Sequence, residues 1–210
     1  MNYDRSAMEH RAAARASLSG KWGDAVVLTL VYGLIMGAIP IGANEFVSYQ
    51  IGNIIQLLLC PIYYGFTVAF LDSIRTGESC RVGQLFDGFR EYGKVFGTTL
   101  LMYVYIFLWT LLLIVPGIIK GYSYAMTMYV MRDNPEMKFN AAIERSMAMM
   151  KGHKFDLFYL QLTFIGWMLL SILTLGIGFL WLGPYVQTAT AHFYEDVKNE
   201  YQDKLKAELA

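Results

Sequence analysis

The sequence alternates between long apolar runs and shorter polar segments that carry most of the charge. Three runs are nearly free of charged residues: Ala25–Leu71, Val95–Met131 and Leu157–Tyr194. A membrane-spanning helix needs about 20 apolar residues, so each run is too long for a single crossing. We therefore expect each run to form two crossings joined by a tight turn.

Helix-breaking residues occur near the middle of each run. They are Pro40, Gly42, Asn44 and Glu45 in the first run, Pro116 and Gly117 in the second, and Gly176, Gly178 and Gly183 in the third. The pattern predicts transmembrane helices at roughly 25–43, 51–71, 96–114, 117–131, 157–175 and 179–194. The predicted fold class is all-α, a polytopic membrane protein with six transmembrane helices in three hairpins.

Composition and charge agree with this interpretation. The chain is 56% hydrophobic and 16% charged, whereas soluble domains average about 45–50% apolar and about 25% charged residues. Every Lys and Arg except Lys120 lies before the first predicted helix, after the last, or in the loops that follow the second and fourth. Basic loops stay on the cytoplasmic side, so both termini are expected in the cytoplasm.

Three polar segments have helical character of their own. Residues 6–20 are helix-prone, and residues 80–96 place apolar side chains at three- and four-residue steps. In 133–152, Asp133 or Asn134 can cap a helix that Gly152 ends. We expect amphipathic helices along the inner membrane surface, and packing against the bundle as re-entering connectors is an equal alternative.

The second helices of the three hairpins can be aligned with one another. The alignment superimposes Thr67, Thr127 and Thr190, and it places Asp72, Arg132 and Glu195 together at the inner boundary. We interpret residues 1–210 as one integral membrane domain. Its approximate repeat units are 1–76, 77–134 and 135–198, and 197–210 form a polar C-terminal tail.

Polar residues inside the predicted helices are candidate ligand contacts near the middle of the membrane. They are Gln56, Gln161, Gln187, Thr67, Thr127 and Thr190. These side chains could line a shared cavity. The alternative, which is the more common arrangement, is that they form hydrogen bonds between neighbouring helices.

Lys120 is the single charged residue between Lys94 and Arg132. If helix four begins at Pro116 or Gly117, Lys120 lies in its first turn at the outer boundary. Its long side chain could then extend to the headgroup zone and stay solvated. Alternatively, Lys120 could bind an anion or a lipid phosphate together with Gly117 and Tyr122 at the helix start.

The chemical inventory does not point to catalysis. His10, His153 and His192 are scattered, and the sequence has no HExxH, GxSxG or Walker pattern. We therefore expect no enzyme, metal centre, cofactor or nucleic-acid partner. Basic residues beside aromatic ones adjoin the predicted spans, which favours membrane lipids as partners and leaves other membrane proteins as further candidates.

Several segments resemble, in order, a bacterial integral-membrane family known only as a domain of unknown function. They are LFDGFREYGK, LLLIVPGIIKGYSYAM, DNPE, SMAMMKGHKFDLF, FIGWMLLSILTLGIG and LWLGPYVQTATAHFY, within Gly20 to Asp196. The resemblance implies a multi-pass protein of the bacterial plasma membrane, found largely in Gram-positive bacteria, and it implies no activity or site. A looser resemblance is to the membrane portion of some glycerophosphodiester phosphodiesterases.

Two functions remain as expectations. The first is a non-enzymatic scaffold or accessory factor of the cell envelope that binds lipids or partner helices, which the lack of paired charges within the predicted spans favours. The second is a transporter or lipid-translocating protein with a midplane site between the hairpins, which Pro61 and Pro184 favour. A cavity lined by the six polar positions would favour the transporter.

Overall fold

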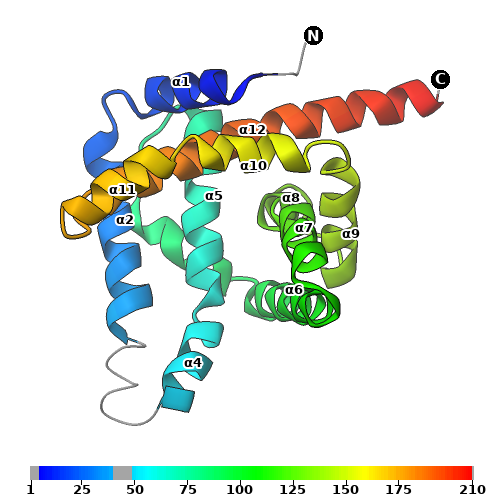
Figure 1. Ribbon diagram of the computed structural model, residues 1–210, viewed down its shortest axis with the longest axis horizontal. Helices are drawn as coiled ribbons and strands as arrows, with labels where there is room; N and C mark the ends of the chain where they lie inside the picture. Colours follow the sequence, from blue (N-terminus) through cyan, green and yellow to red (C-terminus); the bar gives the residue numbers. More distant parts are fainter. Residues whose placement is uncertain (1–4, 40–48, 210) are drawn as a thin grey trace.

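The computed structural model describes residues 5–39 and 49–209, and every regular element in these residues is helical (Figure 1). The predicted all-α fold class is confirmed. In chain order the elements are α1 (Ala7–Leu18), α2 (Trp22–Gly33), η1 (Leu34–Ala38), α4 (Tyr49–Leu58), α5 (Cys60–Thr76), η2 (Val82–Phe89), α6 (Tyr92–Leu112), α7 (Ile114–Tyr124), α8 (Thr127–Asp133), α9 (Phe139–Met149), α10 (Lys154–Leu162), α11 (Ile165–Leu173) and α12 (Phe179–Leu209).

The helix-prone N-terminal segment forms α1, and its start is set by local hydrogen bonds. The backbone N–H of Ser6 donates to the Glu9 carboxylate at 2.6 Å, and the Ser6 hydroxyl accepts from the Glu9 N–H at 3.4 Å. This reciprocal pair is a capping box, which satisfies backbone donors that a helix start leaves free. Helix α1 then packs along α12.

The helices do not form a parallel bundle. In Figure 1, α2 and α5 run down the view, α12 crosses the molecule together with α1 and α10, and α6 is seen nearly end-on. Helix α12 contacts α1, α2 and α5, whereas α6 contacts α5, α7 and α9. The core lies where α5, α8 and α12 meet, and there the fully buried rings of Tyr129 and Tyr194 stack with centroids 5.0 Å apart.

Two of the predicted outer turns occur close to the expected residues. Helix α6 ends at Leu112, and an extended Leu113 leads directly into α7, slightly before the predicted start at 117. Helix α11 ends at Leu173 and α12 begins at Phe179, with Gly176 between them at a φ of 89° that favours glycine. The predicted turn at 40–45 lies outside the described residues.

Three of the predicted helices are each divided in two. The predicted helix 51–71 breaks at Leu59, because Pro61 lies in the first turn of α5 and has no backbone N–H to continue the preceding helix. Helices α7 and α8 are separated beside Thr127, and α10 and α11 beside Thr163. Each of these threonine hydroxyls donates at 2.7 Å to the carbonyl three residues earlier, which competes with the helical hydrogen bonds.

Two stretches among the described residues are long and apolar enough to cross a membrane: Tyr92–Leu112 and Lys154–Leu173. A third candidate joins Ala7–Leu18 with Trp22–Ala38, although its two parts are bent by 100°. Most of both complete stretches faces outward, since only 17% and 22% of their apolar windows is buried. The six predicted crossings are therefore not confirmed.

Residues 80–96 do not form the single amphipathic helix that the sequence predicts. Its first part is the 3-10 helix η2, and α6 begins soon afterwards at Tyr92. Helix η2 packs closely against α5, because a Cβ at Gly65 would meet the backbone of Leu85, and one at Gly88 would meet the backbone of Pro61. This segment is a packed connector, which is the alternative that the sequence left open.

Helix α9 also begins later than predicted. Asp133 ends α8, and the residue that precedes α9 is Lys138, so the predicted capping by Asp133 or Asn134 is wrong. Helix α9 packs on α6, where Asn140 Oδ1 accepts a hydrogen bond from the Tyr105 hydroxyl at 3.1 Å. The contact lies well inside α6, so α9 is a packed connector as well.

Candidate functional site

A cavity of about 360 Å³ lies among helices α5, α6, α7, α8, α10 and α12. Its walls carry tyrosines, threonines, glutamines and apolar side chains, and no charged residue. The lining residues are Tyr63, Thr67, Thr99, Met102, Tyr103, Ile106, Gly121, Tyr124, Ala125, Met128, Tyr129, Leu157, Gln161, Val186, Gln187 and Thr190. We refer to this space as the polar cavity.

Four of the six polar positions singled out in the sequence line the polar cavity: Thr67, Gln161, Gln187 and Thr190. They come from α5, α10 and α12, and they meet because α5 and α10 pack near α12. The sequence left open whether such residues line a cavity or join helices. Gln161 and Gln187 do both, because each lines the cavity and each accepts a hydrogen bond from a residue of another helix.

Both glutamines are held by tyrosine hydroxyls. Tyr122 of α7 donates to Gln161 Oε1 at 2.9 Å, and Tyr129 of α8 donates to Gln187 Oε1 at 3.5 Å. Neither glutamine Nε2 makes a hydrogen bond within the described residues. Tyr122 therefore fixes the carbonyl end of the Gln161 amide, whereas the longer contact from Tyr129 holds Gln187 only weakly. The amide N–H groups of both residues remain as donors for a ligand.

Two threonines in the cavity wall have hydroxyls that make no hydrogen bond of good geometry. Thr67 and Thr99 are only 3% and 5% exposed, and neither Oγ1 makes a hydrogen bond of acceptable geometry with a described residue. A buried polar group without a partner costs about 1–3 kcal/mol. Both residues line the cavity, although each Oγ1 is itself almost inaccessible, so a rotation of the side chain would let a ligand or water in the cavity supply the missing hydrogen bond.

The other two predicted positions lie elsewhere. Gln56 lines an adjoining cavity of about 350 Å³, which shares Tyr63, Thr99 and Tyr103 with the polar cavity. Thr127 is fully buried and lines neither cavity, because its hydroxyl donates to the Tyr124 carbonyl at the α7–α8 break. The superposition of Thr67, Thr127 and Thr190 in the repeat alignment therefore does not extend to their surroundings.

Sequence reasoning missed several residues of the site. Tyr63, Tyr103, Tyr124 and Tyr129 line the polar cavity, although tyrosines near predicted span ends are typical of interfacial belts. Thr99 was also missed, and it is the threonine that lines both cavities. Its position beside Thr98 within an apolar run is a signal that could have identified it.

Lys120, Gly117 and Tyr122 do not converge on one point. Lys120 lies in the second turn of α7 rather than the first, with its Nζ 4.7 Å from the Trp109 ring centroid and 3.9 Å from Met147 Sδ. Gly117 faces Thr110 of α6, and Tyr122 bonds to Gln161. The side chain of Lys120 therefore contacts α6 and α9, and the three residues have different neighbours. Binding of an anion or a lipid phosphate at Lys120 stays a prediction.

An ionic cluster joins the ends of α5 and α8 to α12. Arg75 donates to both carboxylate oxygens of Asp133 at 2.6 and 2.9 Å, and Lys198 and the Tyr194 hydroxyl each approach Asp133 Oδ2 at 2.7 Å. Burial opposes ionisation of Asp133, but the hydrogen bonds from Arg75, Lys198 and Tyr194 outweigh it and lower its pKa to about 2.

The same cluster pairs residues that the repeat alignment superimposed. Arg132 donates to Asp72 at 2.8 and 3.3 Å, and Arg75 donates to Glu195 at 2.6 Å. Asp72, Arg132 and Glu195 were expected at one boundary, and the structure brings them to one end of the core. Because these charges are partly buried and mutually bonded, the cluster is a structural tie between the three helices.

The chain matches the family described as "Protein of unknown function (DUF975)" over residues 1–120 and 110–201. No curated protein and no solved structure matches it. The looser resemblance to the membrane portion of glycerophosphodiester phosphodiesterases therefore has no support. The description of the family names no activity.

Proposed function

We propose a function for this chain, which belongs to the DUF975 family of unknown function. It is a non-enzymatic integral membrane protein that binds and translocates a small uncharged polar solute. One observation carries the proposal: the polar cavity is lined by two buried threonines, Thr67 and Thr99, whose hydroxyls make no hydrogen bond of good geometry with a described residue. A cavity of this size is in the usual range for small-molecule sites, about 300–1,000 Å³.

The class of solute follows from the lining. Hydroxyl groups can donate or accept, and the Nε2 atoms of Gln161 and Gln187 donate, so the cavity offers several hydrogen bonds in defined directions. It contains no charged side chain to offset the cost of taking an ion out of water. A neutral molecule with hydroxyl, carbonyl or amide groups therefore fits better than an ion. The cavity also lacks an ionised acid or base, which favours binding over catalysis.

The membrane setting is supported by the exposed apolar surface. Residues 111–115, at the α6–α7 turn, are 65–73% exposed, and Leu173 and Leu175, at the α11–α12 turn, are 80% and 95% exposed. Contiguous apolar surface of this kind is rarely left in water and marks contact with lipid or with another protein. We place the protein in the bacterial cytoplasmic membrane.

The finer topology of this proposal has three hairpins, six crossings and both termini in the cytoplasm. The one-sided distribution of Lys and Arg supports it. In transporters, discontinuous helices often form the substrate site, because a break exposes backbone groups to the cavity. Tyr124 and Ala125, at the break between α7 and α8, line the polar cavity.

Adjacent threonines provide the test, because Thr98 and Thr99 are both buried and both lack hydrogen-bond partners, but only Thr99 lines the cavities. Valine has the same shape as threonine without the hydroxyl. We expect purified wild-type protein to retain a small polar solute, Thr99→Val to lose it, and the matched control Thr98→Val to keep it. Mass spectrometry of small molecules extracted from the three purified proteins measures this retention.

Both variants should also unfold at a higher temperature than the wild type without solute, since each removes an unsatisfied buried hydroxyl. This check shows that solute loss in Thr99→Val is not a failure to fold. A wild-type protein that retains no solute, or equal retention by both variants, would contradict the proposed function.

A second candidate function is a scaffold or accessory factor that binds lipids or partner helices. The exposed apolar turn at 111–115 favours it, because partner helices could cover this surface as well as acyl chains can. A membrane protein that co-purifies in constant ratio with the wild type, but not with a Leu112→Ser/Ile114→Ser variant, would identify the scaffold role.

A further inference from the structure

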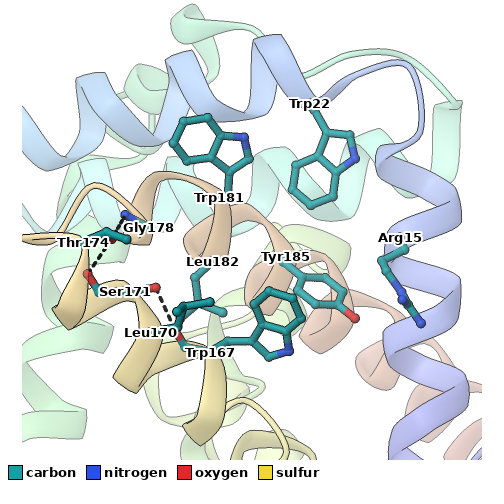
Figure 2. Close-up of a pocket in the computed structure, with 10 residues that line it drawn as sticks. All are labelled: Arg15, Trp22, Trp167, Leu170, Ser171, Thr174, Gly178, Trp181, Leu182 and Tyr185. Carbon is teal, nitrogen blue, oxygen red and sulfur yellow. Dashed lines mark hydrogen bonds between the residues drawn. The ribbon is translucent and has the colours of Figure 1, made fainter.

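A second cavity, of about 430 Å³, opens between α1, α2, α11 and α12 (Figure 2). Its walls are mainly aromatic and apolar, with Trp22 from α2, Trp167 from α11, and Trp181 and Tyr185 from α12. Arg15 of α1 is the single charged residue among its lining residues. We refer to this space as the aromatic pocket.

The polar groups of the aromatic pocket near the α11–α12 turn already have partners. Thr174 Oγ1 accepts from the Gly178 N–H at 2.9 Å, and the Ser171 hydroxyl donates to the Trp167 carbonyl at 2.8 Å (Figure 2). These bonds close the α11–α12 turn. They leave no acceptor in that wall that needs a ligand.

Apart from the Tyr185 hydroxyl, the remaining polar side-chain groups of the pocket are donors without partners among the described residues. None of the three indole N–H groups donates a hydrogen bond to a described residue, and the exposed Arg15 guanidinium has no hydrogen bond or ion pair there. Arg11, one turn earlier on α1, differs, because it donates to the Thr163 carbonyl at 3.2 Å and to the Tyr185 hydroxyl at 3.3 Å. Arg11 therefore holds Tyr185 in the pocket wall, whereas the Arg15 guanidinium remains available for a ligand.

We infer that the aromatic pocket binds one anionic phospholipid, with the phosphate at Arg15 and an acyl chain between Trp22, Trp167 and Trp181. The ligand must combine negative charge, hydrogen-bond acceptors and apolar length, since the pocket offers a free cation, free donors and apolar walls. Phosphate oxygens and ester carbonyls are acceptors, and tryptophan is suited to the boundary between headgroup and chain.

The three pocket tryptophans provide a direct measurement, because the chain has four tryptophans and the fourth is Trp109. In a Trp109→Phe background all tryptophan fluorescence comes from the aromatic pocket. The protein in detergent is titrated with phosphatidylglycerol or phosphatidylcholine whose acyl chains carry bromine, which quenches nearby tryptophan. We expect half-maximal quenching at about a fivefold lower concentration of phosphatidylglycerol than of phosphatidylcholine. One basic residue near an anionic lipid strengthens binding by about this factor.

Two variants separate a specific contact from general attraction between charges. Arg15→Gln should abolish the preference for phosphatidylglycerol. Arg90→Gln, the matched control, removes the same charge from an exposed side chain that pairs only with Asp87 across one helical turn, and it should keep the preference. Equal preference in Arg15→Gln and the parent, or equal loss in both variants, would overturn the inference.

A competition experiment distinguishes a lipid from a free anion. Inorganic phosphate that displaces brominated phosphatidylglycerol at equal concentration would assign Arg15 to a soluble anion and overturn the lipid assignment. The inference rests on the proposed membrane setting but not on solute binding in the polar cavity. Thr99→Val should therefore leave the quenching unchanged, so either proposal can fail while the other holds.

Discussion

Replacing Asp133 by Asn should destabilise the protein near neutral pH. In acid, this destabilisation should disappear. Asp133 receives a two-pronged hydrogen bond from Arg75 on α5 and further bonds from Lys198 and Tyr194 on α12. Its carboxylate is 13% exposed, so solvent screens these interactions only in part. The substitution removes the charge at nearly constant shape and leaves two cations with Glu195 alone.

The magnitude follows from the shift in pKa. The pKa of Asp133 is lowered from 3.8 to about 2, and at 1.36 kcal/mol per unit this corresponds to about 2 kcal/mol. Because the folded pKa is the lower one, the unfolded state binds more protons in acid. The contribution is therefore complete above about pH 5 and is lost as the pH falls through 4 toward 2.

The assay is chemical or thermal unfolding in detergent from pH 7 to pH 2.5, with wild type and Asp133→Asn measured side by side. We expect the difference between them to be about 2 kcal/mol at pH 7 and to shrink toward zero at the acid end. Asp72→Asn is the control, since Asp72 is bonded by Arg132 alone and should cost less, about 1 kcal/mol. A difference for Asp133→Asn that stays constant with pH would refute the electrostatic reasoning.

Two further predictions concern helix packing and topology. Gly117→Ala should lower stability by about 1–3 kcal/mol in thermal unfolding, because its Cβ would lie 2.9 Å from Thr110 Cα. Gly121→Ala is the control and should be nearly neutral, because nothing lies within 4 Å of a Cβ at Gly121. In a cysteine-free background, Leu175→Cys should react with an impermeant thiol reagent from outside intact cells. Glu144→Cys should react only after the cells are opened. Labelling of position 144 from outside would contradict the six-crossing topology.

The sequence determined the helical class and the positions of two of the turns between helices. Apolar runs without alternation specify helices, and glycine or proline ends them, so the turns at Leu113 and Gly176 were located closely. The start of α1 was equally accessible, because Ser6 and Glu9 form a local capping box. These features depend on neighbours within a few residues, which the sequence shows directly.

The sequence also identified part of the polar cavity. Gln161 and Gln187 stand out because an amide inside an apolar helix requires a partner, whichever helix supplies it. Their tyrosine partners could not be found this way. Tyr122 and Tyr129 are common residues at span ends, and only the packing of α7 and α8 against α10 and α12 brings them to the amides.

Only the tertiary structure decided the directions of the helices and the partners of their charged residues. Because α6 is apolar on nearly all sides, its sequence does not specify which face meets α5, α7 or α9, and shape complementarity between side chains sets the crossing. Lys120 meets Trp109 and Met147 for this reason. Asp133 likewise ends α8 and binds Arg75 instead of capping α9, since an ion pair between distant helices forms only after packing has placed both groups together.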